Sequence, residues 1–177
     1  MKLAQCLELT DDILAPYSAH AAIQGYKNHV CRVINLCSSL GDLNECDLEK
    51  ITIAACFHDL GIYTSNTFDY LPPSIDLARE YLVRNGRGEW TDEITSTIDQ
   101  HHRVRPIDGV DRRLAEVFRK ADLVDFSLGL IKFDLPRSTV SAVKREFPNR
   151  GFHRNLVRVA CGWIARHPLR PVPVLKW

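Results

Sequence analysis

The chain has 177 residues, of which 45% are hydrophobic and 25% are charged. This length suits one domain with a substantial core, and the composition is typical of a soluble globular protein. No apolar run approaches the roughly 20 residues that a membrane-spanning helix needs, and residues 1–12 lack the pattern of a secretory signal. We therefore expect a cytoplasmic protein with no membrane partner.

Charge is unevenly distributed along the chain. Residues 1–100 contain 7 Lys+Arg and 15 Asp+Glu, whereas residues 101–177 contain 16 and 7, and the net charge is only +1. Either the two halves attract each other through their surfaces, or the basic half forms a wall that faces an anionic substrate. The basic residues of the second half are scattered and lack interleaved stacking aromatics, so no nucleic-acid partner is expected.

The six cysteines are spread along the chain without a CxxC pair, which argues against a structural zinc site. Cys31, Cys37 and Cys56 occupy apolar helical stretches, where a free cysteine behaves as a small hydrophobic residue. Because disulfides are rare in the cytosol, we expect buried, reduced thiols.

Apolar residues recur at three- and four-residue steps through most of the chain, which predicts an all-α fold. The first clear helix covers residues 17–40, and we expect Gly41 to close it in a left-handed conformation. The next covers residues 47–60. Its C-terminal end is apolar nearly all round and is therefore predicted to be buried, and Gly61 is expected to break it.

The same periodicity continues after a loop over residues 64–73. Helices are predicted, in chain order, over residues 74–84, 91–102, 111–127, 138–146 and 152–165. Pro73 suits the first turn of one of these helices, and Thr91 can cap another. No hairpin signal is found, so no sheet is predicted. We expect one helical domain over residues 1–177, with a core at about 17–127, a C-terminal helical extension at 137–167 and a proline-rich tail at 168–177.

A histidine and an aspartate, His58 and Asp59, follow one another at the end of the most apolar helix. A buried ionised carboxylate without a partner is costly, so Asp59 should be paired or bound to a metal. Two further potential ligands, His29 and Asp122, lie on apolar faces of other helices. Two imidazoles and two carboxylates suit one divalent transition metal, which would be Mn, Fe, Co, Ni or Zn, and they suit Mg less clearly.

The order of these residues resembles the H…HD…D pattern of the HD superfamily of metal-dependent phosphohydrolases. The sequences "NHVCRV" around His29, "AACFHDLGIY" around the His-Asp dyad and "KADLVDFS" around Asp122 carry this resemblance, which covers about residues 20–127. It implies a helical bundle of the HD-domain type in which His29, His58, Asp59 and Asp122 bind the metal. It also implies that a metal-activated water hydrolyses a nucleotide or another small phosphoester, with Asp59 orienting the water or accepting its proton.

Two adjacent histidines, His101 and His102, lie between the dyad and the last aspartate. One of them can point inward from the helix over residues 91–102, where it would donate a proton to the leaving oxygen or bind a second metal. The alternative is a partly exposed pair at the end of a helix. Dinuclear members of the superfamily carry more histidines in this interval, and the Gly-Tyr-Pro signature of one branch is missing, so a mononuclear site is predicted.

Arg103, Arg105 and Lys120 are the cations nearest to the expected site in sequence. They are the candidates for binding the phosphate of a small phosphorylated substrate, because an arginine fork can hold phosphate in a bidentate manner. Solvated surface charge is the alternative for each of them. Arg32 is expected to pair with an acid at the rim of the site.

Three functions remain open at this stage. The first is the phosphohydrolase, the second is an iron oxygenase or a small-molecule hydratase or lyase on the same scaffold, and the third is a regulatory module that retains its metal without catalysis. Many HD hydrolases have a lysine soon after the dyad, where this chain has Ile62 and Tyr63, so the substrate class stays open. The apolar stripe of the helix over residues 152–165 suits core packing or a dimer contact, which leaves a homodimer open as well.

Overall fold

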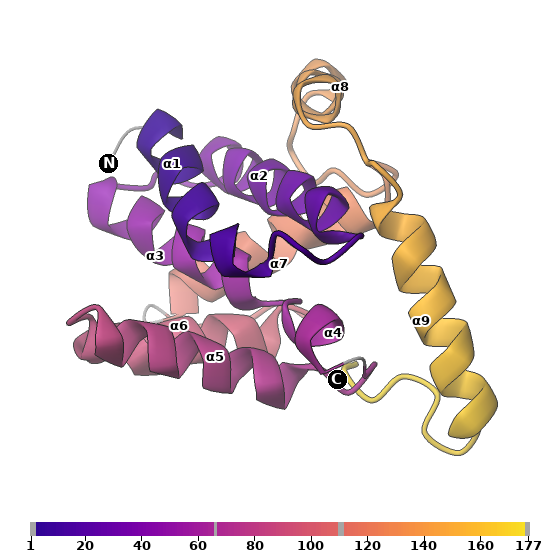
Figure 1. The fold of residues 1–177 in the computed structure, drawn as a ribbon. Coiled ribbons are helices and arrows are strands. Elements are labelled where there is room, and N and C mark those ends of the chain that lie inside the picture. Colours follow the sequence, from indigo (N-terminus) through magenta and orange to yellow (C-terminus); the bar gives the residue numbers. More distant parts are fainter. Residues whose placement is uncertain (1–2, 66, 110–111, 176–177) are drawn as a thin grey trace.

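The computed structural model describes residues 3–65, 67–109 and 112–175 (Figure 1). No β-strand occurs in these three ranges, which confirms the all-α prediction. The helices are α1 (Leu3–Leu14), the short 3-10 helix η1 (Ala15–Tyr17), α2 (Ile23–Leu40), α3 (Glu45–Phe57), α4 (Gly61–Thr64), α5 (Leu71–Arg84), η2 (Gly88–Trp90), α6 (Thr91–Gln100), α7 (Arg113–Phe126), α8 (Arg137–Glu146) and α9 (Phe152–Arg166). Within the described part of the chain, no helix has the length and apolar character needed to cross a membrane.

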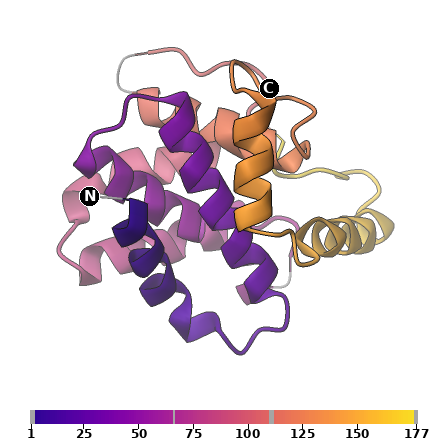
Figure 2. The ribbon, with the colours of Figure 1, turned by 90° about the horizontal axis from the view of Figure 1, so that it is seen from above.

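Helix α2 is central to the packing of the helices. It contacts α7, α3 and α1, while α5 packs against α6 and α3 (Figure 1). Seen from above, α8 lies beside α2, and α9 extends from the edge of the molecule (Figure 2). Because α2, α3 and α7 all contact one another, residues on the inner faces of these three helices can meet at one place.

The C-terminal half of α3 is buried on all sides, as its continuous apolar sequence predicts. Residues 51–60 are all buried, and they belong to the same core as the inner faces of α2 and α7. All six cysteines are unbridged, and Cys31, Cys37 and Cys56 are buried as expected, whereas Cys46 and Cys161 are exposed, so the expectation of burial is wrong for these two. The dyad at the end of α3 therefore lies deep in the apolar core.

Helices α1 and α4 were not predicted, and the starts of α2 and α3 differ from those that the apolar spacing predicts. Helix α2 begins at Ile23 and not at residue 17, because the chain first forms η1 and a short turn. Helix α3 begins at Glu45, two residues early. Here Asn44 accepts a hydrogen bond from the backbone N–H of Asp47, and the carboxylate of Asp47 accepts one from the backbone N–H of Asn44. This reciprocal capping fixes the start of the helix.

The predicted roles of two glycines are wrong. Gly41 follows α2 in an extended conformation (φ −132°) and not in a left-handed one. It provides space, since a Cβ at this position would lie 3.0 Å from the Val117 side chain of α7. Gly61 starts α4, and a Cβ there would lie only 2.5 Å from the carbonyl oxygen of Tyr70. Glycine at this position thus lets the start of α5 pack directly behind the dyad.

The later helices agree closely with the predicted ranges, with two differences. Helix α5 begins at Leu71, so both following prolines lie in its first turn. Thr91 is the first residue of α6 and its side chain makes no capping hydrogen bond, so its predicted capping role is wrong. The predicted helix start at Asp111 lies outside the described residues, and α7 is described from Arg113 onward.

Ion pairs connect the acidic and basic halves of the chain. Arg113 of α7 contacts Asp47 of α3 over 2.6 Å, and Arg170 of the C-terminal tail lies 3.2 Å from Asp69 in the loop before α5. Val174 of the same tail is buried in the core. The segment after α9 is therefore held against the body of the molecule, so that α9 and the tail form one wall beside the central helices (Figure 1).

Candidate metal centre

His58 and Asp59 lie at the buried C-terminal end of α3. Nδ1 of His58 lies 2.8 Å from the carbonyl oxygen of Ala55, one turn earlier. In the neutral ring Nδ1 therefore carries the proton, and Nε2 is left with a bare lone pair. The backbone N–H of Asp59 donates to the hydroxyl of Tyr26, which donates to the carbonyl oxygen of Cys56. These bonds fix the end of α3 against α2.

His29 reaches the dyad from α2. Its Nε2 lies 3.0 Å from Nε2 of His58, and its Nδ1 lies 2.7 Å from Oδ2 of Asp125. Asp125 also accepts hydrogen bonds from Nε and Nη2 of Arg32 over 2.6 and 2.8 Å. This buried series of hydrogen bonds from His29 through Asp125 to Arg32 holds the proton of His29 on Nδ1, as carboxylates behind metal-binding histidines do. Arg32 thus pairs with an acid, but behind the cluster and not at its rim.

Asp122 joins the cluster from α7. Its Oδ1 lies 3.4 Å from Nε2 of His29 and 3.7 Å from Nε2 of His58. Oδ2 of Asp59 lies 3.6 Å from Nε2 of His58 and 4.0 Å from Nε2 of His29. All four side chains are buried. The structure therefore brings the four predicted ligands together from three helices.

The cluster has the chemistry of a cation site. Two bare imidazole nitrogens and two carboxylates at these separations repel one another unless a cation or a proton lies among them. His29, His58 and Asp59 also offer ligand atoms within 4.8 Å of one another. These residues fit a divalent metal.

The pKa values of the cluster follow from its carboxylates. Burial lowers the pKa of His29, but Asp122 and Asp125 outweigh this effect and raise it to about 9. Burial raises the pKa of Asp122, but hydrogen bonds to His29 and His58 hold it well below its usual range. When no cation is bound, a proton is therefore retained among these groups, and a metal ion must displace it.

His101 faces the cluster from the end of α6. Its Nδ1 lies 2.6 Å from the carbonyl oxygen of Ile98, and its Nε2 lies 3.5 Å from Oδ1 of Asp59. This Nε2 and this Oδ1 are both buried without a hydrogen-bond partner in the described part of the protein. Asp59, His101 and His102 form a second group that could hold an ion. The mononuclear site stays a prediction.

His102 differs from its neighbour. It is partly exposed, its Nε2 is hydrogen-bonded to the hydroxyl of Tyr70, and its ring centroid lies 3.9 Å from that of His101. Burial and the nearby charge of His101 lower the pKa of His102 to about 3. The ring of His102 is therefore neutral near pH 7. Of the two histidines, His101 is the one aimed at the dyad.

A cavity of about 530 Å³ opens from the cluster toward the surface. Its lining includes three of the four predicted ligands and both histidines of the pair. Arg103 and Arg119 line it as well. Nε of Arg103 is buried and has no hydrogen-bond partner among the described residues. Arg119 is held by two bonds of 2.7 Å to the carboxylate of Glu116. Nε of Arg103 is thus an unpartnered cationic donor in the described lining, whereas the guanidinium of Arg119 is committed to Glu116 and to the carbonyl oxygen of Arg103.

The other two predicted phosphate ligands lie elsewhere. Arg105 is exposed in the segment after α6. Nζ of Lys120 lies 3.7 Å from the carboxylate of Glu116 and 5.6 Å from the ring centroid of Phe133. Neither residue belongs to the described lining of the cavity. The structure therefore does not bring Arg105 and Lys120 to the metal cluster.

Sequence reasoning missed three residues of this site, of which Arg119 and Asp125 belong to α7. They lie three positions before and three positions after Asp122. Residues three apart on a helix share a face, so this spacing was the signal that could have identified both. Tyr70 was also missed, and its distance in sequence from His102 left no local signal.

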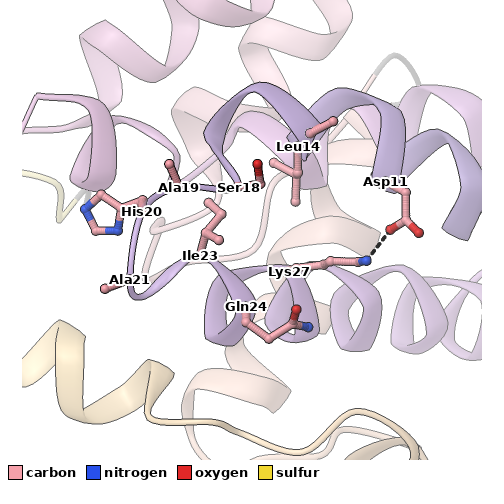
Figure 3. Close-up of a pocket in the computed structure, with 10 residues that line it drawn as sticks. Asp11, Leu14, Ser18, Ala19, His20, Ala21, Ile23, Gln24 and Lys27 are labelled. Atoms are coloured by element: carbon pink, nitrogen blue, oxygen red, sulfur yellow. Dashed lines mark ion pairs between the residues drawn. The ribbon is translucent and has the colours of Figure 1, made fainter.

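A second cavity, of about 330 Å³, lies where α1, η1 and α2 meet (Figure 3). Asp11 and Lys27 form an ion pair across it, and His20 lies at its other end (Figure 3). His20 packs its ring edge-on against Tyr63. The single imidazole and the neutralised ion pair give this cavity no ligand set comparable to that of the metal cluster, and we assign no site to it.

The fold and the cluster together define an all-α protein with a buried His/Asp cluster that could hold a metal ion. A family model described as HD domain matches residues 26–127. This range covers more than half of the chain, and the chain therefore belongs to the HD-domain family. All four predicted ligands lie within the matched range. Most HD-domain proteins are metal-dependent hydrolases. Comparisons with curated proteins and with solved structures gave no match.

Proposed function

We propose that this HD-domain protein is a metal-dependent phosphohydrolase that acts on a small phosphoester. The observation that carries the proposal is the convergence of the Nε2 atoms of His29 and His58 with the carboxylates of Asp59 and Asp122, three of which line an open cavity. A divalent transition metal (Mn, Fe, Co, Ni or Zn) would lower the pKa of a bound water and polarise a phosphoryl oxygen. The four residues would hold it.

The surrounding residues have distinct tasks in this proposal. Oδ1 of Asp59, which is buried without a partner, is placed to orient the attacking water or to accept its proton. Burial lowers the pKa of His101, but Asp59 and Asp122 outweigh this effect and raise it, so its ring can hold a proton for the leaving oxygen. The ring of His102 contacts that of His101 at a tilt of 44°, with centroids 3.9 Å apart, and would support its orientation. We assign the phosphate oxygens to Arg103 and not to the exposed Arg105.

A second candidate function is an iron-dependent oxygenase on the same scaffold. The second ion-binding group, formed by Asp59, His101 and His102, favours it because such an oxygenase would need two irons. Two irons per chain together with oxygen consumption would support the oxygenase. One metal per chain together with phosphate release would support the hydrolase. A regulatory module would retain metal without turnover on any substrate.

The proposal is tested by metal analysis of protein purified without a histidine tag, followed by a phosphate-release screen with several divalent ions. We expect metal-dependent release of phosphate from small phosphoesters. His58→Ala and Asp59→Ala should lose both metal and turnover, while His20→Ala, which changes an exposed imidazole outside the cluster, should retain both. Intact metal content and turnover in His58→Ala and Asp59→Ala would refute the proposal.

A further inference from the structure

The cavity beside the His/Asp cluster continues outward as an apolar space between α7, α9 and the C-terminal tail. At its inner end, Phe152 of α9 stacks on His29, with ring centroids 4.0 Å apart and planes within 12°. Farther out, the wall is formed by Leu123, Leu156, Val157, Ala160, Val172 and Leu175. Phe152 contacts His29, a predicted metal ligand, and both residues line the same cavity. The apolar wall is therefore continuous with the predicted metal site.

The mouth of this cavity is also apolar. Val104, Phe126 and Val157 are 51%, 55% and 61% exposed, and all three belong to the lining. They come from the segment after α6, the end of α7 and the outer part of α9. Exposed apolar surface of this extent typically marks a binding site. Here it leads inward to the metal ligands, so the molecule that covers it is one that also reaches the cluster.

The polar groups of the cavity are few, and the metal site already uses most of them. Tyr70 and His102 are hydrogen-bonded to each other, which leaves Arg103 and Arg119 as the cations. No Ser, Thr, Asn, Gln or Lys occurs in the part of the lining that the structure describes. A nucleoside would bring a base and a ribose with several donors and acceptors into this space. Leaving such groups unpaired opposes binding, so the cavity disfavours a nucleoside.

We propose that the substrate of this site is a phosphomonoester of an apolar alcohol, such as an alkyl phosphate. Its phosphate would face the metal ligands and Arg103, and its apolar part would lie along α9 and the tail. The volume of about 530 Å³ falls within the roughly 300–1,000 Å³ usual for small-molecule sites. This inference rests on the proposed function, from which it takes the hydrolysis of the phosphoester. In that reaction the water oxygen bonds to phosphorus, the P–O bond to the alcohol breaks, and the alcohol oxygen takes a proton.

The test compares methyl, butyl and hexyl phosphate with adenosine 5′-monophosphate in the presence of Mn²⁺. A fully buried methylene improves binding roughly fourfold. Because this cavity is open to solvent, we expect kcat/KM to rise at least about tenfold from methyl to hexyl phosphate and to exceed the value for the nucleotide. Equal values for the three alkyl phosphates, or a preference for the nucleotide, would overturn the inference.

A matched pair of variants locates the apolar part of the substrate. Val157→Gln changes an exposed residue of the lining, whereas Leu169→Gln changes a residue that is 99% exposed and outside it. The ratio of hexyl to methyl turnover should fall about threefold or more in Val157→Gln and stay unchanged in Leu169→Gln. If Val157→Gln instead converts a dimer to a monomer and leaves the ratio unchanged, the mouth is a contact between copies and the inference is wrong.

Calorimetry with methylphosphonate and hexylphosphonate, which cannot be hydrolysed, separates this inference from the proposed function. Tighter binding of hexylphosphonate supports the apolar subsite even if no substrate releases phosphate, and in that case the phosphohydrolase assignment alone fails. Equal binding of the two phosphonates overturns the apolar subsite even if phosphate release is observed.

Discussion

Replacing Asp125 by asparagine removes a negative charge behind His29 and preserves the size of the side chain. The carboxylate accepts from Nδ1 of His29 over 2.7 Å and from Nε and Nη2 of Arg32 over 2.6 and 2.8 Å. An amide offers one oxygen in place of two, so at least one of these contacts is lost. Arg32 is only 2% exposed, and its charge would be left without a counter-charge.

Two magnitudes follow from this geometry. Removing one partner of a buried ion pair costs about 3–5 kcal/mol. We expect the lower end of this range in Asp125→Asn, because Arg32 keeps its 2.8 Å hydrogen bond to the carbonyl oxygen of Phe147. The loss of a carboxylate behind a metal-binding histidine typically weakens metal binding 10- to 100-fold. We expect a decrease of this size for the ion held by His29.

The assay combines urea denaturation with calorimetric titration of Mn²⁺. Asp76→Asn is the matched control, because Asp76 pairs with Arg79 on the surface of α5 with a side chain that is 76% exposed, and such pairs contribute at most about 1 kcal/mol. In Arg32→Met/Asp125→Asn the unpaired charge is removed, so stability should recover while metal affinity stays low. Unchanged metal affinity in Asp125→Asn would refute the role assigned to this residue.

Further effects are expected at the same site. Gly61→Ala should lower the free energy of unfolding by about 1–3 kcal/mol in urea denaturation, because its Cβ would lie 2.5 Å from the carbonyl oxygen of Tyr70; an unchanged value would contradict this packing. A divalent ion at 100 times its Kd should stabilise the fold by about 2.7 kcal/mol, and a Tm insensitive to metal and chelator would oppose binding. Because the pKa of His29 is raised to about 9, calorimetric Mn²⁺ affinity should increase with pH up to that value; a flat profile would contradict proton displacement.

The ligand cluster could be predicted from sequence because each ligand stands out against an apolar helical surface. Asp59 and Asp122 are carboxylates on buried helix faces, where a charge needs a partner. The helices that carry them were recognised from their apolar spacing, and the packing of α2, α3 and α7 then brings the ligands together. Apolar spacing supplied the helices and the buried candidates, and the H…HD…D order that resembles the HD superfamily selected these four residues as the ligand set.

The roles of the glycines could not be predicted in this way. A Cβ at Gly41 would crowd the side chain of Val117, and a Cβ at Gly61 would clash with the carbonyl oxygen of Tyr70. In the first case the contact joins residues far apart in sequence, and in the second it depends on how the chain turns after the dyad. A rule that assigns glycine to helix ends by local conformation does not contain this information.

The choice among the cations failed for a different reason. Lys120 was selected because it is close in sequence to Asp122, but residues two apart on a helix point in different directions. Arg119 is three positions from Asp122 and shares its face, and it is Arg119 that lines the cavity. Helical geometry, and not proximity along the chain, decides which charge reaches the metal cluster.

The central claim is that His29, His58, Asp59 and Asp122 hold one divalent ion. Anomalous diffraction from a crystal grown with Mn²⁺ tests it most directly. We expect a peak within about 2.0–2.3 Å of both imidazole Nε2 atoms and of an oxygen of each carboxylate. No anomalous peak at these residues, with the four side chains directed away from one another, would contradict the claim.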